Sequence, residues 1–155
     1  MPARNRSAQV GAAFLYDRRV QFAETDLAGI VHFSWYFRYM EEAEHALWRA
    51  AGLSISPHEP TVGWPRVAAA FDYKSPLRFE EVFQVAVRIN AVSRRTLQYG
   101  CTLHRNQTMI GHGVLTAACV TTDAQGAMIA VDLPPGLVER LEAAMSGPAP
   151  ANDHV

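Results

Sequence analysis

The chain has 155 residues, which suffices for one domain with a single hydrophobic core, and its hydrophobic content of 49% is ordinary for a globular protein. A formal net charge of −1 excludes a strong long-range attraction to nucleic acid or to an anionic membrane. No apolar run reaches the length of about 18 residues that a membrane-spanning helix needs, so we expect a cytoplasmic protein without membrane insertion.

The first part of the chain predicts a flexible lead-in, a strand and a long helix. Residues 1–12 are mostly small and polar, and we expect them to be a flexible N-terminus. Apolar residues tend to alternate between residues 14 and 24, which predicts a strand. A helical pattern then runs from Ser34, a favourable N-cap residue, to Gly52, a favourable residue just after a helix. The helical period predicts one buried apolar stripe, formed by Tyr36, Met40, Ala43 and Leu47.

The second part of the chain is dominated by strand patterns. Proline and glycine make residues 52–65 an irregular connection. Alternating or β-branched runs follow, and they predict strands at 67–73, 82–92, 96–104, 109–122 and 128–131. A short helix is expected at Leu137–Met145 after a pair of prolines. We therefore expect one domain over residues 13–145 and a disordered tail over 146–155.

This element order predicts an α+β fold, in which one antiparallel sheet is wrapped around the long helix. One helix cannot cover both faces of such a sheet, so the opposite face or an edge is left for a partner subunit.

The sequence contains no motif for disulfide, metal, serine-hydrolase or nucleotide chemistry. Cys101 and Cys119 lie in strand-like apolar runs and are expected to be reduced core residues. The chain has no metal-ligand spacing, no nucleophile elbow and no glycine-rich nucleotide loop. We expect neither a metal nor a cofactor, which leaves a cofactor-free hydrolase or a binding protein.

A carboxylate just before the long helix is the first candidate for chemistry. Asp26 precedes the predicted helix start, where free N–H groups and the helix dipole favour negative charge. An aspartate at such a place is, however, more often part of a local turn than a catalyst. Glu24, two residues earlier, is expected to face solvent or to pair with an arginine.

The stretch E-T-D-L-A-G-I-V-H-F-S-W-Y-F-R-Y-M-E resembles the opening signature of hot-dog thioesterases of the 4-hydroxybenzoyl-CoA thioesterase type. The shared features are an acidic residue, threonine, aspartate, a loop of small residues with glycine, and then a helix rich in aromatic residues. The predicted strand order also resembles the hot-dog layout over roughly residues 14–132.

The resemblance implies hydrolysis of an acyl-CoA thioester by a homodimer or homotetramer, with the site between two subunits. It implies that Asp26 acts as general base or nucleophile and that the amide of Phe33 stabilises the oxyanion. Some family members carry an assisting histidine directly before the helix. His32 stands one place earlier here, so an assisting role and a place in the pocket wall both remain open. The resemblance and the residue types also suggest substrate-binding residues, namely Gly29, Ile30, Val31, Trp35, Tyr36, Trp64, Arg94 and Arg95.

Two alternatives remain. A hot-dog hydratase or dehydratase carries an Asp-x-Asn-x-x-His pattern, but Asp26 and His32 lie six residues apart and no asparagine stands between them. The other alternative is a module that binds acyl-CoA or an acyl carrier without catalysis.

Overall fold

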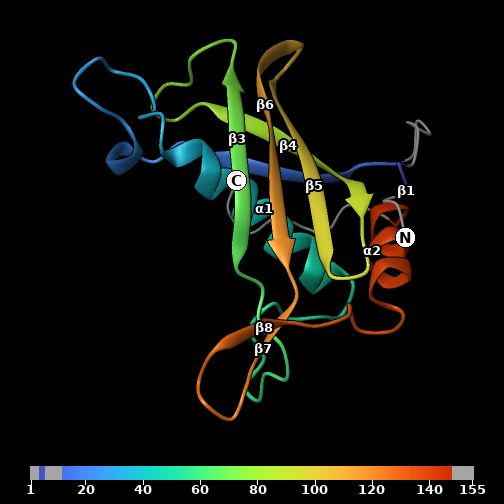
Figure 1. Cartoon of the computed structure of the whole chain (residues 1–155). Helices are drawn as coiled ribbons and strands as arrows, with labels where there is room; N and C mark the ends of the chain where they lie inside the picture. Colours follow the sequence, from blue (N-terminus) through green and yellow to red (C-terminus); the bar gives the residue numbers. More distant parts are fainter. Residues whose placement is uncertain (1–3, 6–11, 148–155) are drawn as a thin grey trace.

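One antiparallel sheet curves around one long helix (Figure 1). The computed structural model describes residues 4–5 and 12–147. The main sheet has the strand order β1-β4-β5-β6-β3. Strand β2 also pairs with β4, at the start of β4, whereas β1 pairs with the end of β4. Its strands are β1 (Arg4–Asn5), β2 (Phe14–Arg19), β3 (Arg66–Tyr73), β4 (Val82–Val92), β5 (Thr96–Arg105) and β6 (Thr108–Ala118). The other elements are η1 (Phe22–Glu24), α1 (Trp35–Ala50), α2 (Leu137–Met145) and the hairpin of β7 (Val120–Thr122) and β8 (Met128–Ala130).

The core lies between α1 and the inner face of the sheet. The four residues of the predicted stripe on α1 are all buried, as are the inward side chains of the sheet strands opposite them. Helix α1 contacts β2 at one edge of the sheet, β4 next to it, and β3 at the opposite edge, so the sheet encloses the helix. The predicted α+β hot-dog fold, with the sheet wrapped around one long helix, is confirmed.

Two glycines let β6 approach its neighbours closely, Gly113 toward α1 and β3 and Gly111 toward β3. A Cβ atom on Gly113 would lie 2.6 Å from the carbonyl oxygen of Ala70 and 2.7 Å from the sulfur of Met40. A Cβ atom on Gly111 would lie 2.4 Å from the carbonyl oxygen of Asp72. Real Cβ atoms do not come this near to other atoms, so β6 needs glycine where it crosses the helix and β3.

Three sequence predictions about local structure need correction. The strand expected over residues 14–24 ends at Arg19, and Phe22–Glu24 form a 3₁₀ turn because Gln21 and Glu24 form a reciprocal capping box there. The run 109–122 is split at Cys119, because Ala118 still pairs with Thr96 in the main sheet whereas Val120 pairs with Ala130 in a separate hairpin. Of the expected flexible N-terminus, Arg4–Asn5 pair with β4. The rest of that stretch apart from residue 12, and most of the expected tail, lies outside the described residues.

The outer edge strand β3 stays largely uncovered. Its residues Val67–Ala70 are exposed, although Ala69 pairs with the buried Leu115 and therefore points to the same face as the core. Figure 1 shows no helix over the outer face of the sheet. An exposed edge with apolar inner residues is a surface that a second protein segment can cover.

Candidate active site

The chain between η1 and α1 forms a small closed loop. Thr25 and Val31 pair as an antiparallel bridge at its base. Inside this pair, the Asp26 N–H donates to the Ile30 carbonyl at 3.0 Å, and the Gly29 N–H donates to the Asp26 carbonyl at 2.9 Å. Gly29 has a φ of 76°, the left-handed region that favours glycine, so the turn depends on this residue. The loop 26–30 thus closes on itself through main-chain hydrogen bonds.

The Asp26 side chain is anchored through one oxygen only. The Ala28 N–H donates to its Oδ1 at 2.8 Å, which is the local turn that sequence reasoning had weighed against catalysis. The Oδ2 atom has no hydrogen-bond partner among the described residues, and the side chain is exposed. The turn fixes the direction of the carboxylate and leaves one oxygen available for a ligand or a water molecule.

Helix α1 begins directly after this loop, as predicted. Ser34 is the N-cap residue, but its hydroxyl does not cap the helix and instead shares a hydrogen bond of 2.8 Å with Nδ1 of His32. The Trp35 N–H donates to the His32 carbonyl at 3.0 Å. The N–H of Phe33 donates to no acceptor within residues 4–5 and 12–147. An unpartnered N–H at the positive end of a 16-residue helix is suited to bind an oxyanion.

The carbonyl of Phe33 is held from the sheet. The hydroxyl of Tyr73, at the end of β3, donates to it at 2.8 Å. The Tyr73 ring also packs edge-on against buried Tyr36, with ring centres 5.1 Å apart. Burial raises the pKa of Tyr36 above its usual value, so this phenol stays neutral at physiological pH. Sequence reasoning missed Tyr73, which is far from the loop in the chain; its place at the end of a strand was the only available signal.

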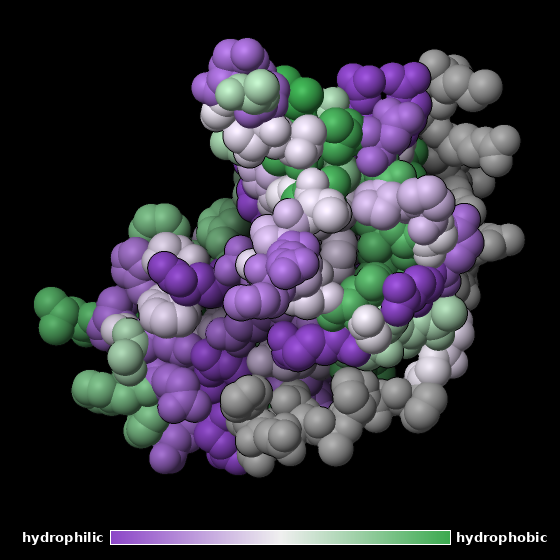
Figure 2. All heavy atoms as spheres, turned by 90° about the horizontal axis from the view of Figure 1, so that it is seen from below, coloured by the Kyte–Doolittle hydropathy of each residue, from purple (hydrophilic) through white to green (hydrophobic). Residues whose placement is uncertain are grey.

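Exposed apolar side chains surround the loop. Leu27 is fully exposed, Phe22 is 74% exposed and Phe33 is 63% exposed. Phe22 packs edge-on against Phe79, which is also exposed. Figure 2 shows apolar atoms projecting at the end of the molecule that carries this loop. An apolar surface of this kind around a carboxylate usually marks a binding site or an interface.

The structure brings together only part of the predicted site. Residues 29–31 form the loop, and Trp35 and Tyr36 lie in the first turn of α1, all next to Asp26, His32 and Phe33 in the chain. Trp64 packs edge-on against Trp48, near the far end of α1. At 1.5 Å per residue, that place is about 20 Å from the helix start.

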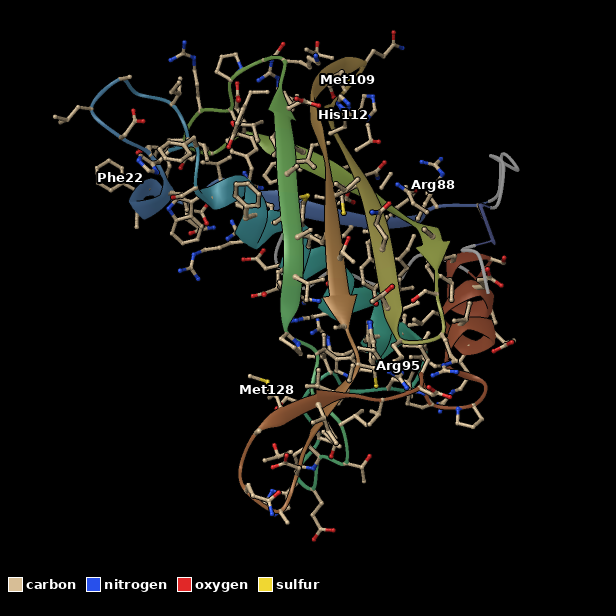
Figure 3. All side chains as sticks on the ribbon, in the orientation of Figure 1. Phe22, Arg88, Arg95, Met109, His112 and Met128 are labelled. Atoms are coloured by element: carbon tan, nitrogen blue, oxygen red, sulfur yellow. The ribbon has the colours of Figure 1, made fainter. Side chains whose placement is uncertain are left out.

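Arg94 and Arg95 lie at the other end of the sheet from the loop. Both Nε atoms contact Oδ1 of Asp132, at 3.0 and 3.2 Å. Figure 3 shows Arg95 near the lower end of the sheet, far from Phe22. Strand β4 runs between these two places, and its 11 residues span about 35 Å. Within one protomer these arginines do not meet the loop, and their role in substrate binding remains a prediction.

Two buried carboxylates lie behind the loop and along the helix. Glu24 is 2% exposed and pairs with Arg18, so the expected arginine partner is confirmed and the expected solvent exposure is wrong. Glu44 is fully buried in α1, and Arg66 Nη2 lies 2.9 Å from its Oε2. This contact lacks hydrogen-bond geometry, and neither Glu44 oxygen has a hydrogen-bond partner among the described residues. Sequence reasoning overlooked Glu44, although its place four residues after Met40 puts it beside the apolar stripe.

A sheet wrapped around a helix, with a carboxylate loop at the helix start, defines the hot-dog class of proteins. The family model described as "Thioesterase-like superfamily" matches residues 20–141. The chain therefore belongs to this superfamily and is a thioester hydrolase.

Individual proteins are also similar to this chain in sequence or in structure. A predicted esterase of Aquifex aeolicus (strain VF5) is 41% identical over 87 residues, which are 56% of this chain and 68% of that protein. The 1,4-dihydroxy-2-naphthoyl-CoA hydrolase of Parasynechococcus marenigrum (strain WH8102) is 28% identical over 119 residues, or 70% of this chain and 78% of the hydrolase. The crystal structure of a mutant 4-hydroxybenzoyl-CoA thioesterase with 4-hydroxybenzoyl-CoA superposes with a TM-score of 0.75 at 17% identity, covering 84% of this chain and 99% of that chain. This last likeness concerns the fold.

Within the described residues, no helix is long and apolar enough to cross a bilayer. The same residues contain no cluster of three or more histidine, cysteine or acidic side chains that could hold a metal ion.

Proposed function

We propose that the chain hydrolyses an acyl-CoA thioester to a free acid and CoA, with Asp26 and the Phe33 amide as the catalytic groups. The main support is the order of two groups along a loop closed by its own hydrogen bonds. A carboxylate with one oxygen unbonded by the described residues is followed by a helix N–H that these residues also leave without an acceptor. The relatives named above that act on CoA esters make this the first substrate class to test.

The chemistry has two possible first steps. As general base, Asp26 takes a proton from water while the oxygen of that water bonds to the thioester carbonyl carbon. As nucleophile, Asp26 itself bonds to that carbon, and water then hydrolyses the mixed anhydride. In both cases the C–S bond breaks and CoA leaves as a thiolate, which a thiol pKa of about 8.5 makes an easy leaving group.

The Phe33 N–H is proposed to bind the oxyanion that develops on the carbonyl oxygen. Removing one such donor typically raises the barrier by about 3–4 kcal/mol. His32 is proposed as an assisting residue or as part of the pocket wall, and its hydrogen bond to Ser34 fixes the ring in either role.

We further propose that the working enzyme is a dimer formed along β3. A second copy would cover the exposed inner residue Ala69 and the apolar side chains around the loop. If two β3 strands pair antiparallel, each loop faces the end of the partner that carries the β4–β5 turn. This arrangement would bring Arg94 and Arg95 of one copy nearer to the loop of the other, where they suit the phosphates of CoA.

The catalytic proposal is tested with Asp26→Asn on a panel of aromatic, short-chain and medium-chain acyl-CoAs, followed by free thiol release. We expect turnover by the natural chain and a loss of at least about 100-fold in the variant. Asp123→Asn is the matched control, because the Asp123 Oδ1 also accepts main-chain N–H groups in a turn, and this turn lies in the β7–β8 hairpin outside the proposed site. Turnover unaffected by Asp26→Asn would refute the site assignment. Binding of acyl-CoA without turnover by the natural chain would support the binding module instead.

The dimer is tested by sedimentation of an Ala69→Lys variant. We expect the natural chain to sediment as a dimer or larger and the variant to shift toward monomer, because the lysine places a charge on the proposed interface. A natural chain that is monomeric at the concentrations used in the activity assay would contradict the proposal.

A further inference from the structure

The Glu24 carboxylate is buried and joins three parts of the chain. Arg18 of β2 donates to both of its oxygens, at 3.1 Å to Oε1 and at a shorter distance to Oε2. The hydroxyl of Tyr39, in the second turn of α1, donates to Oε1 at 2.9 Å. The Gln21 N–H donates to the same oxygen at 2.7 Å. This one carboxylate therefore ties the end of β2, the turn η1 and the helix together.

The network around Glu24 is stiffened by a second carboxylate. Glu42, on α1, accepts a hydrogen bond from Arg18 Nε at 2.9 Å. Burial alone would lower the pKa of Arg18, but the hydrogen bonds to Glu42 and Glu24 raise it, so the guanidinium stays charged. Tyr39 is fully buried, and burial next to Glu24 raises its pKa, so its hydroxyl remains a donor. Each partner of Glu24 is thus held in the state that binds a carboxylate.

The main chain of the same residue holds the catalytic loop. The His32 N–H donates to the Glu24 carbonyl at 2.9 Å. This bond lies just outside the Thr25–Val31 bridge, so it forms the base of the loop. Asp26 follows Glu24 by two residues, and Phe33 follows His32 by one. The relative position of the two proposed catalytic groups is therefore set where the Glu24 carbonyl meets His32.

We propose that Glu24 is a positioning residue for thioester hydrolysis, acting through Asp26 and the Phe33 amide. Its side chain fixes the base of the loop to α1, and its carbonyl fixes the two arms of the loop to each other. This proposal rests on the proposed function. It differs from a role in folding alone because it predicts an effect on kcat that exceeds the effect of losing an equally buried carboxylate elsewhere.

The test compares Glu24→Gln with Glu44→Gln, with the best acyl-CoA of the panel as substrate and at a temperature well below unfolding. Both glutamates are buried and face an arginine, but Glu44 has no link to the loop. A misplacement of about 1 Å in a catalytic group can lower the rate about 100-fold. We expect Glu24→Gln to lower kcat by about 10-fold to 100-fold with KM within about twofold, and Glu44→Gln to leave both within about twofold.

Hydrogen exchange gives a second readout of the same variants. We expect faster exchange at residues 25–33 in Glu24→Gln, with unchanged exchange in the second half of α1, and no change at residues 25–33 in Glu44→Gln. If Glu24→Gln keeps the natural kcat, or if the two variants lose kcat equally, the proposal is wrong.

A milder variant covers the case in which Glu24→Gln does not fold. Tyr39→Phe removes one hydrogen bond to Glu24 and keeps the ring in place. We expect it to fold and to lower kcat by about 3-fold to 10-fold, which corresponds to a lost hydrogen bond. An unchanged kcat in Tyr39→Phe then overturns the proposal. The proposed function fails separately, if Asp26→Asn retains turnover. If Asp26→Asn is inactive while Glu24→Gln and Tyr39→Phe are fully active, the positioning role of Glu24 is wrong and the proposed function still stands.

Discussion

The buried carboxyl of Glu44 makes the stability of the fold depend on pH. Burial raises the pKa of Glu44 from the usual 4.5 to about 7, although Arg66 acts in the opposite direction. Between these pH values the folded chain keeps a proton that the unfolded chain has lost. The contribution of Glu44 to stability is therefore most favourable below about pH 4.5, decreases as the pH rises toward 7, and is lowest above it.

The magnitude follows from the difference between the two pKa values. A pKa of about 7 in place of 4.5, at 1.36 kcal/mol for each pH unit, corresponds to about 3 kcal/mol. A glutamine at this position does not titrate. We expect the stability of Glu44→Gln relative to the natural chain to rise by about 3 kcal/mol between about pH 4.5 and pH 8. The attraction of Arg66 is already contained in this difference, because it lowers the pKa of Glu44 against the effect of burial.

Urea unfolding of both proteins at a series of pH values, at one fixed protein concentration, measures this difference. Glu41→Gln is the matched control, because Glu41 is half exposed and its carboxylate lies 3.9 Å from the same arginine. Its difference from the natural chain should vary with pH by less than about 1 kcal/mol. A difference for Glu44→Gln that is constant across the pH range, or that falls as the pH rises, would refute the reasoning.

Two further substitutions test the geometry around the site and the sheet. Tyr73→Phe removes the hydroxyl that holds the Phe33 carbonyl and should lower kcat several-fold, about as much as one lost hydrogen bond. The unfolding temperature should change by no more than about 3 °C. An unchanged kcat would show that the helix start needs no support from β3. Gly111→Ala places a Cβ atom 2.4 Å from the Asp72 carbonyl oxygen and should destabilise the fold by about 1–3 kcal/mol in urea unfolding. Gly63→Ala, whose added Cβ atom meets only Val120 at 3.5 Å, should stay within about 0.5 kcal/mol of the natural chain, and equal effects of the two alanines would contradict the close approach of β3 to β6.

Local patterns predicted most of the fold. The helix from Ser34 to Gly52 was foreseen because its apolar period and its terminal residues lie within about 20 residues of chain. Gly52 has the expected positive φ of 72°, whereas the Ser34 hydroxyl does not cap the helix. The strands of the main sheet alternate because one face is buried and the other is open. These features depend on near neighbours in the chain, so a single sequence contains them.

The parts that sequence missed depend on distant partners. Glu44 can be buried because Arg66, 22 residues later, lies beside it. Tyr73 reaches Phe33 across 40 residues, and no short-range pattern records that contact. The break of the long run 109–122 at Cys119 depends on two different partner strands, since Ala118 pairs with Thr96 and Val120 pairs with Ala130. The candidate site was predicted from a short motif, whose loop and helix start are adjacent in the chain, and its role stays a prediction.

The tip of the self-closed loop contributes little to the stability of the fold. The base of the loop includes the buried core residue Val31, whereas Leu27 and Ala28 at the tip are exposed and contribute no side chain to the core. The tip is held by main-chain atoms, by Asp26 and by the turn at Gly29, so substitutions at positions 27 and 28 leave every one of these bonds possible. Positions 27 and 28 can therefore change with little effect on the stability of the fold, which leaves the exposed tip of the loop free to vary.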